Sequence, residues 1–422
     1  MEINIDRNDS RNEINYKRKN KILTLLSILG PGVLVMLADT DVGSIVTAAQ
    51  SAAQWGYRLI GLQLILIPIV YFVQELTNRL GIVTGKGHGE LIKEAFGKKW
   101  EVFSVVTLLV AVIGALVTEF TGILGVGILF GVSKWVTVPL AAIVLILITT
   151  TGNYKKVEKT AILIGLFELV FIIIAIISKP NLNDIAMGFV NQPLKDGGYW
   201  LLISANVGAV VMPWMIFYQQ SAVVEKKLPK SYLKMSKVDT AIGSVVTQII
   251  VIAIMLIVAS TIGKTNPNAP LNSVQQLVDA LTPFVGSFAG KLLFAVGIIG
   301  AALVAAIVVS LAISWSIGEL LNVPASLNNT IKEAPVFYGV YIITIVVSAA
   351  IVLSGIPLVP LTIAVETLNS LLLPIVLGFL IALAWKTLPK EYSLKTWEKV
   401  VLIIIYVSIC SLGIVTVIDL FI

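Results

Sequence analysis

The chain has 422 residues, of which 57% are hydrophobic and 13% are charged, and its mean hydropathy is +0.95. This composition excludes an ordinary water-soluble globule, in which about 25% of the residues are charged. The formal net charge is +6, but the basic residues are distributed as in a membrane protein, with no sign of a nucleic-acid surface. The single cysteine, Cys410, and the single histidine, His88, exclude an intramolecular disulfide and a site with several histidine ligands.

Long apolar runs, separated by charged or turn-rich segments, follow a polar tail at 1–22. A helix needs about 20 apolar residues to cross roughly 30 Å of hydrocarbon. We therefore predict an all-α integral membrane protein with eleven transmembrane helices. The predicted spans are 23–54, 59–84, 102–131, 134–152, 157–178, 201–224, 239–263, 290–320, 336–354, 358–385 and 398–421.

The distribution of lysine and arginine predicts the orientation of these spans. If the N-terminus is cytoplasmic, 23 of the 30 basic residues fall in cytoplasmic segments and six fall in external segments. Basic residues are enriched on the cytoplasmic side of membrane proteins. We therefore expect a multi-pass protein of the cell membrane with a cytoplasmic N-terminus and an extracellular C-terminus.

The first and sixth predicted spans contain residues that interrupt a regular helix. The first contains Gly30-Pro31-Gly32 and the polar segment 39–44, and the sixth contains Asn206, Gly208 and Met212-Pro213-Trp214. Proline removes a backbone donor and glycine tolerates unwound backbone, so we predict a break in both helices. Five spans separate the breaks, which predicts two inverted five-helix repeats, at 23–178 and 201–385, with an additional helix 11 at 398–421. Paired broken helices in such a repeat indicate a binding site near the bilayer midplane.

Carboxylates inside a membrane are costly unless they face a partner. Asp39, Asp41 and Glu366 have no basic residue in their own spans, so we expect a bound cation or a proton to balance their charge. The alternative for Glu366 is a protonated acid that is hydrogen-bonded inside the bundle. Asp39 and Asp41 can face one ion together only if the backbone is unwound. Otherwise one of them binds the ion and the other caps a half-helix or faces the entrance.

Two further features have a structural and a functional interpretation. Glu75 and Arg79 stand four residues apart on the second span, which predicts a structural ion pair on one helix face. Met212 offers a thioether that suits a softer ion such as Mn²⁺, although methionine in a membrane helix is usually packing. The sequence contains no catalytic triad, metal-protease helix or nucleotide fingerprint, so we predict neither an enzyme nor a bound cofactor.

Several motifs, taken in order, resemble those of the Nramp family of divalent metal transporters. They are Gly30-Pro31-Gly32 with Asp41-Val42-Gly43-Ser44, Arg79-Leu80-Gly81-Ile82-Val83-Thr84-Gly85, and Gly208-Ala209-Val210-Val211-Met212-Pro213. The resemblance extends from about Gly30 to the end of the tenth span. It implies a LeuT-like fold with an inverted five-plus-five repeat and uptake of divalent metal into the cytoplasm. It also implies that Asp41, the Ala209 carbonyl and the Met212 sulfur contact the ion.

Other positions depart from the family pattern. Ser44 replaces a liganding asparagine, Glu366 replaces a glutamine beside the ion, and Trp214 and Gln219 replace two histidines. Glu119 keeps one of two acidic positions associated with proton passage. These departures resemble the subgroup called Nramp-related magnesium transporters, which implies transport of Mg²⁺ and Mn²⁺ without proton coupling.

The chemistry of the residues favours the same function. Histidine is the side chain best suited to exchange protons near neutral pH, and additional oxygen ligands favour hard ions such as Mg²⁺. We therefore predict a secondary transporter that moves Mg²⁺ and Mn²⁺ by alternating access. The predicted metal-site residues are Asp41, Ser44, Ala209, Met212, Glu366 and Asp39. The candidates for gating or a proton path are Glu119, Trp214 and Gln219.

Two other functions stay open. The first is a proton-coupled symporter for Mn²⁺ or Fe²⁺ that uses Glu119 or Asp39 in place of the missing histidines. The second is an amino-acid carrier of the same fold, although two aspartates at the break would repel a substrate carboxylate. The predicted partners are the transported metal ion and the lipid bilayer, without nucleic acid. The oligomeric state is open, with a monomer as the working expectation.

Overall fold

The computed structural model describes residues 30–151, 153–265, 271 and 274–421. The predicted tail at 1–22 and the beginning of the first predicted span therefore lie outside the described residues. Every regular element in the described ranges is helical, which agrees with the all-α prediction.

The first half of the described chain contains α3 (Pro31–Asp39), α4 (Val42–Trp55), α5 (Ile60–Thr84), α6 (His88–Phe96), α7 (Lys98–Leu129), α8 (Lys134–Thr149), α9 (Tyr154–Gly165), η1 (Leu166–Leu169), α10 (Val170–Ser178) and α11 (Leu182–Val190). The second half contains α12 (Gly197–Val210), α13 (Pro213–Glu225), η2 (Lys230–Tyr232), α14 (Leu233–Ser260), α15 (Ile262–Thr265), α16 (Val274–Val285), α17 (Ser287–Leu321), α18 (Pro335–Leu353), α19 (Leu358–Thr387), η3 (Lys390–Tyr392) and α20 (Thr396–Phe421).

Many of these helices are long and apolar enough to cross a membrane. Among the described residues there are nine such helical stretches, or ten if the bent pair α3 and α4 is counted as one span. The predicted span at 134–152 corresponds to α8, an apolar helix of 16 residues, which is shorter than the usual span of about 20 residues. The chain is therefore a multi-pass membrane protein, and its described residues hold nine or ten spans by length and composition.

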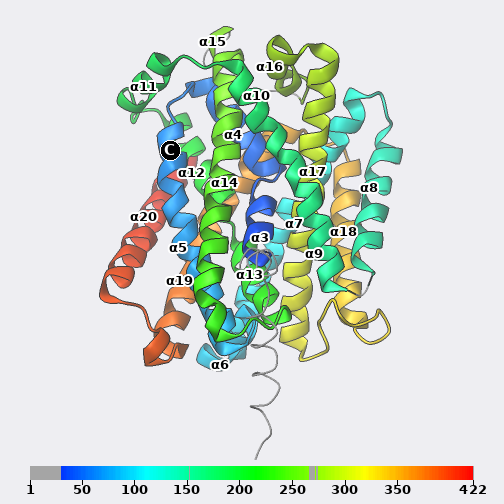
Figure 1. The fold of residues 1–422 in the computed structure, drawn as a ribbon, viewed down its shortest axis with the longest axis vertical. Coiled ribbons are helices and arrows are strands. Elements are labelled where there is room, and N and C mark those ends of the chain that lie inside the picture. Colours follow the sequence, from blue (N-terminus) through cyan, green and yellow to red (C-terminus); the bar gives the residue numbers. More distant parts are fainter. Residues whose placement is uncertain (1–29, 152, 266–270, 272–273, 422) are drawn as a thin grey trace, which may run out of the picture.

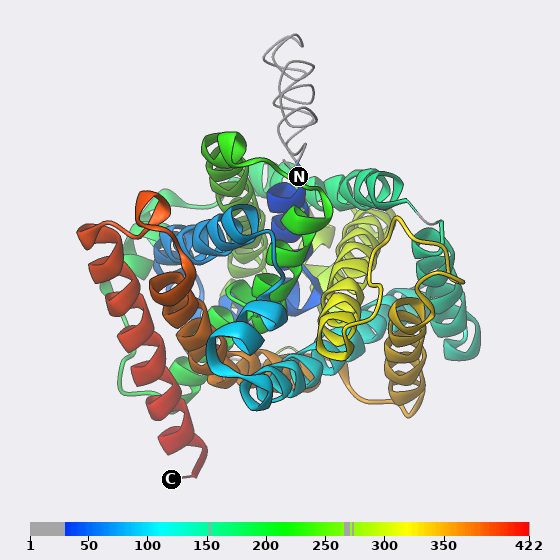
Figure 2. The same ribbon diagram turned by 90° about the horizontal axis from the view of Figure 1, so that it is seen from below.

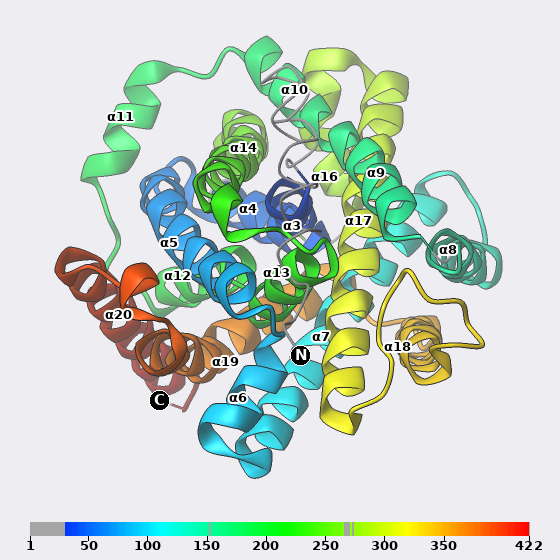
Figure 3. The same ribbon diagram turned by 60° about the horizontal axis from the view of Figure 1, so that its bottom comes forward.

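The helices form a bundle around a central pair. In Figure 3, α3 and α13 lie in the middle, with α5, α7, α14, α17 and α19 around them. The helices α8, α18 and α20 lie at the edge of the bundle (Figure 1), and the view from below in Figure 2 shows the same place for α20. These outer helices expose large apolar side chains, among them Leu140, Ile343 and Ile404. This surface suits lipid, whereas the central helices bury nearly all of their residues.

A close contact between α12 and α19 positions the second predicted break beside Glu366. A Cβ atom added at Gly208 would lie 1.9 Å from the backbone oxygen of Glu366. Only glycine permits this approach, and small residues serve this purpose at helix contacts within membranes. The contact holds the Gly208–Met212 segment of the chain beside the α19 residues that carry Glu366.

Candidate functional site

The first helix break lies between α3 and α4, whose axes are bent by 45°. Asp39 is the last residue of α3, and Asp41 is the N-cap of α4, where its Oδ1 accepts a hydrogen bond of 2.7 Å from the Ser44 N–H. Pro31 does not cause this break, because it occupies the first turn of α3, where its missing N–H costs nothing. The interruption is therefore at Thr40, and each helix end leaves backbone groups free for other partners.

The second break separates α12 from α13. The first of these helices ends at Val210, Met212 is the N-cap of the second, and Pro213 begins it. Both breaks meet through Ser44, whose hydroxyl lies 2.6 Å from the Asp39 carbonyl oxygen and 2.8 Å from the Ala209 carbonyl oxygen. One hydroxyl proton serves only one of these acceptors at a time. The two breaks thus place two carbonyl oxygens and a hydroxyl around one point.

Two further carboxylates reach this point from other helices. Glu366 of α19 and Asp41 both lie against Gly43, since a Cβ atom added there would be 2.1 Å from Glu366 Oε1 and 3.0 Å from Asp41 Oδ1. Glu119 of α7 accepts a hydrogen bond of 3.2 Å from the Val42 N–H at the first turn of α4. Ionised groups here would be stabilised by a cation, because water is excluded.

A fifth acid, Glu168, is absent from the residues expected from sequence. It lies in η1, a short 3₁₀ segment that interrupts the helix formed by α9 and α10. Its carboxylate faces Thr40 and lies within charge–charge range of Asp41 and Asp39. An acidic residue within an apolar run could have identified Glu168 as a candidate. The sequence alone does not show that η1 turns this side chain toward the first break.

All five acids are buried, and none forms an ion pair with a cationic side chain in the part of the chain that the structure describes. Their side chains, Asp39, Asp41, Glu119, Glu168 and Glu366, are at most 1% exposed. Seven of their ten carboxylate oxygens make no hydrogen bond within the described residues. No group of three His, Cys, Asp or Glu side chains in the described ranges is arranged as a ready metal-ligand set. The site therefore combines carboxylates with carbonyl and hydroxyl oxygens, which is the donor chemistry that hard cations prefer.

The remaining expected residues make hydrogen bonds to other partners. The Trp214 indole N–H donates to the Met212 sulfur at 3.0 Å, so this thioether already has a polar partner. Gln219 donates to Asn78 at 2.6 Å, and that side chain donates to Thr240, so Gln219 belongs to a polar chain linking α13, α5 and α14. Gln219 makes no hydrogen bond to the five carboxylates within the described ranges.

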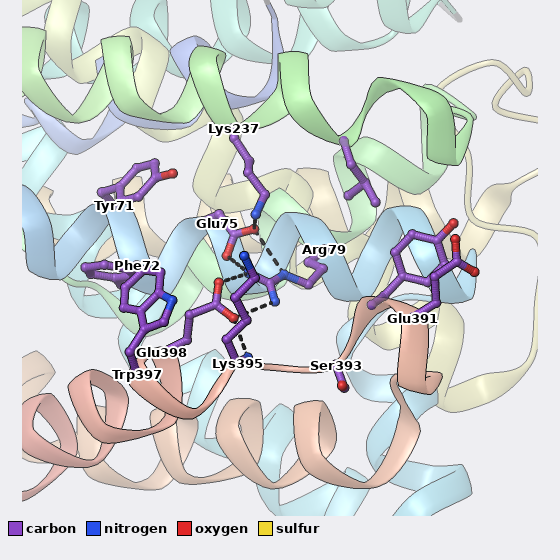
Figure 4. A pocket seen from close by; sticks show the side chains of 12 residues that line it. Tyr71, Phe72, Glu75, Arg79, Lys237, Glu391, Ser393, Lys395, Trp397 and Glu398 are labelled. Atoms are coloured by element: carbon purple, nitrogen blue, oxygen red, sulfur yellow. Dashed lines mark hydrogen bonds and ion pairs between the residues drawn. The ribbon is translucent and has the colours of Figure 1, made fainter.

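Glu75 and Arg79 form part of a larger ion network away from the breaks. Their closest oxygen and nitrogen atoms are 2.6 Å apart, and Arg79 also pairs with Glu398 of α20 at 2.8 Å. Lys237 of α14 reaches Glu75 at 2.8 Å. Figure 4 shows these side chains converging from three elements. The pair anticipated from the spacing of four residues thus also connects α5 to α14 and α20.

The fold and the site define a class of protein: a multi-pass helical membrane protein with buried acidic side chains beside two broken helices. The chain belongs to the Nramp family, because the family model described as natural resistance-associated macrophage protein-like matches residues 32–419.

Curated relatives agree with this membership. The chain is 25% identical over 397 residues to a divalent metal cation transporter MntH of Verminephrobacter eiseniae, covering 89% of this chain and 84% of the relative. It is 28% identical to the metal transporter Nramp3 of Oryza sativa and 28% identical to MntH of Latilactobacillus sakei. The matches span only 48% and 64% of the lengths of these two relatives.

The fold matches that of an Eremococcus coleocola manganese transporter with a TM-score of 0.70 at 18% identity, over 95% of this chain and 96% of that chain. It also resembles MhsT in complex with L-phenylalanine, with a TM-score of 0.59 at 17% identity, over 93% of this chain and 97% of that chain. At these identities the two likenesses show a shared fold and nothing more.

Gly43→Ala tests whether Glu366 and Asp41 act on one cation. The added methyl group would displace the Glu366 carboxylate, so we expect the affinity for Mn²⁺ to fall at least about tenfold, corresponding to roughly 1.4 kcal/mol. Isothermal titration of the purified protein measures this affinity. Gly339→Ala is the matched control, because nothing lies within 4 Å of its added Cβ atom. An unchanged affinity in Gly43→Ala would contradict a shared site.

Proposed function

We propose that this chain is a secondary transporter for the divalent cations Mg²⁺ and Mn²⁺, and that it works by alternating access across the plasma membrane. The observation that carries the proposal is the meeting of two helix breaks at Ser44, beside five buried carboxylates, seven of whose ten oxygens make no hydrogen bond within the described residues. Names of relatives that describe metal transport support the choice of a metal as substrate.

In this proposal α8 also crosses the membrane, which gives eleven spans. Residues 23–178 and 201–385 form the two inverted repeats, 398–421 adds the last helix, and 1–22 is a cytoplasmic tail. The C-terminus is extracellular, and the working unit is a monomer. The equivalent positions of the two breaks, one in the first span of each half, support the repeat.

Asp41 is the main anionic ligand in the proposed site. The Ala209 carbonyl and Ser44 supply neutral oxygens beside it, and Asp39 and Glu366 add charge. Met212 contacts the ion only if its sulfur releases the Trp214 indole, so its contribution is greatest for softer ions. An oxygen-rich site with excess negative charge favours Mg²⁺, which keeps part of its water shell.

The absence of a histidine from the described site supports transport without proton coupling. His88, the single histidine of the chain, lies in α6, where its Nδ1 is 2.9 Å from Gln220 Oε1. Burial lowers the pKa of His88 to about 4, in spite of the hydrogen bond to Gln220, which raises it. This imidazole is therefore neutral at physiological pH and does not exchange protons there.

One observation favours the second candidate, a proton-coupled Mn²⁺ or Fe²⁺ symporter. Five buried carboxylates surround the breaks, whereas one divalent ion neutralises only two charges. Protons are the simplest carriers of the remaining positive charge, and Glu119 and Glu168 are available to hold them. The excess of acids disfavours an amino-acid carrier, since a substrate carboxylate would meet like charges.

Metal flux into proteoliposomes, with internal pH recorded at the same time, separates these candidates. We expect Mg²⁺ and Mn²⁺ uptake without acidification of the lumen. Acidification that follows Mn²⁺ or Fe²⁺ uptake, with Mg²⁺ inert, would support the proton-coupled function and overturn the first proposal. Empty liposomes are the control for leakage.

A further inference from the structure

A cavity of about 330 Å³ lies beside the ion network of Glu75, Arg79, Lys237 and Glu398, at the end of the bundle that carries α6. Three elements form it: the last turns of α5, the first turns of α14, and the segment from η3 to the start of α20 (Figure 4). Its volume is at the lower end of the roughly 300–1,000 Å³ typical of small-molecule sites. It is therefore large enough for a compact polar group.

The floor of the cavity is electrically balanced. Arg79 uses three of its nitrogens to bond to Glu75 and Glu398. Glu75 also forms an ion pair with Lys237, and Glu398 accepts a hydrogen bond of 2.7 Å from the Lys395 backbone N–H. These two acids and two bases neutralise each other, so an occupant of the cavity meets no uncompensated charge from the floor.

The groups with unused bonding capacity lie at the rim. Lys237 is 38% exposed and bonds to Glu75 through one of its three donors. Lys395 and Glu391 are exposed and form no side-chain ion pair within the described ranges. Since the charge of Lys237 is already balanced by Glu75, the rim presents one unpaired cation, Lys395, and one unpaired anion, Glu391. This pair, with the two unused donors of Lys237, complements a molecule that carries both a phosphate and an ammonium group.

Aromatic side chains place this rim at the level of the lipid headgroups. Trp397 packs edge to face on Phe72, with ring centroids 5.7 Å apart, and is 53% exposed. Tyr71 and Tyr392 also line the cavity. Exposed tryptophan and tyrosine near the ends of spanning helices are typical of the membrane–water boundary. A membrane lipid is therefore better placed to occupy the cavity than a soluble metabolite.

We propose that this cavity binds the headgroup of a zwitterionic phospholipid with a primary amine, of the phosphatidylethanolamine type. The phosphate contacts Lys237 and Lys395, and the ammonium group donates to Glu391. The lipid connects α14 to the beginning of α20 and adds to the attachment that Arg79 and Glu398 provide. A choline headgroup lacks N–H donors for Glu391, and a headgroup with only negative charge would face that carboxylate.

Native mass spectrometry of the full chain, with added phosphatidylethanolamine, phosphatidylglycerol or phosphatidylcholine, tests this site. We expect phosphatidylethanolamine to bind most tightly. Lys395→Ala is expected to weaken its binding at least about tenfold, the effect of losing one charge-assisted hydrogen bond. Lys399→Ala is the matched control, because this exposed lysine lies one turn further along α20 and outside the cavity.

Glu391→Gln should abolish the preference for phosphatidylethanolamine over phosphatidylglycerol. Equal binding of all three lipids, tighter binding of phosphatidylglycerol by the parent chain, or equal binding by Lys395→Ala and the parent would overturn the proposal. Tight binding of free phosphoethanolamine, without acyl chains, would show that the occupant is a soluble compound and would overturn the lipid assignment. These outcomes do not depend on metal transport, so they are independent of the proposed function.

Discussion

Replacing Asp41 with asparagine is expected to abolish metal transport while the protein stays folded. Asparagine keeps a side-chain oxygen for the Ser44 N–H and is as good an N-cap as aspartate. The change therefore removes the charge while preserving the start of α4. Loss of a residue that supports a metal ligand typically costs about 10–100-fold in affinity, and we expect a larger loss for the ligand itself. Flux of Mg²⁺ and Mn²⁺ into proteoliposomes measures the effect.

The stability of the same variant provides a second measurement. Asp41 lies within charge–charge range of other buried acids, so removing its charge should leave the unfolding temperature equal to or above that of the parent. Asp196→Asn is the control, because Asp196 caps α12 in the same way, through the Tyr199 N–H at 3.2 Å. Transport at the parent level in Asp41→Asn would remove Asp41 from the site.

The sequence predicted the region of both helix breaks but not the cause of the first. The break was expected near the middle of the span, beside Asp39 and Asp41, and the bend does occur at Thr40. The Gly30-Pro31-Gly32 segment was part of the reason for expecting it, yet Pro31 begins a regular helix. In the sixth span, Pro213 does mark the break, since it is the first residue of α13. Proline is common in the first turn of a helix, and in the interior of a helix it causes a kink. The residue type alone therefore does not show whether a proline begins a helix or interrupts one.

Contacts between distant parts of the chain were beyond prediction from spacing. Ser44 meets the Ala209 carbonyl across 165 residues of sequence. Glu168 reaches the first break because η1 interrupts its helix, and nothing in an apolar run identifies a 3₁₀ segment. Local pairs behave differently. The separation of four residues between Glu75 and Arg79 is sufficient for contact on one helix face, whereas the participation of Glu398 depends on how α20 packs.

Replacing Glu366 with glutamine is expected to shift selectivity from Mg²⁺ towards Mn²⁺. Mg²⁺ gives up its water shell reluctantly and depends on negatively charged oxygen ligands, so loss of the Glu366 charge should reduce Mg²⁺ flux more than Mn²⁺ flux. We expect the ratio of the two fluxes to change at least about tenfold, equivalent to roughly 1.4 kcal/mol. Glutamine keeps the size of the side chain and an oxygen for Asn369, which donates to Glu366 at 3.0 Å.

Met212→Ala is the complementary variant, and the two should act in opposite directions. Mn²⁺ accepts sulfur more readily than Mg²⁺ does, so removal of the thioether should lower Mn²⁺ flux and leave Mg²⁺ flux unchanged. In the parent the sulfur accepts the Trp214 indole N–H, and a ligand role requires that bond to break when the ion binds. If Glu366→Gln lowers both fluxes equally and Met212→Ala lowers neither, then Glu366 contributes charge without selectivity and Met212 is packing. If the two variants shift the ratio of Mg²⁺ to Mn²⁺ flux in opposite directions, the Glu366 carboxylate and the Met212 sulfur together determine the preference for Mg²⁺.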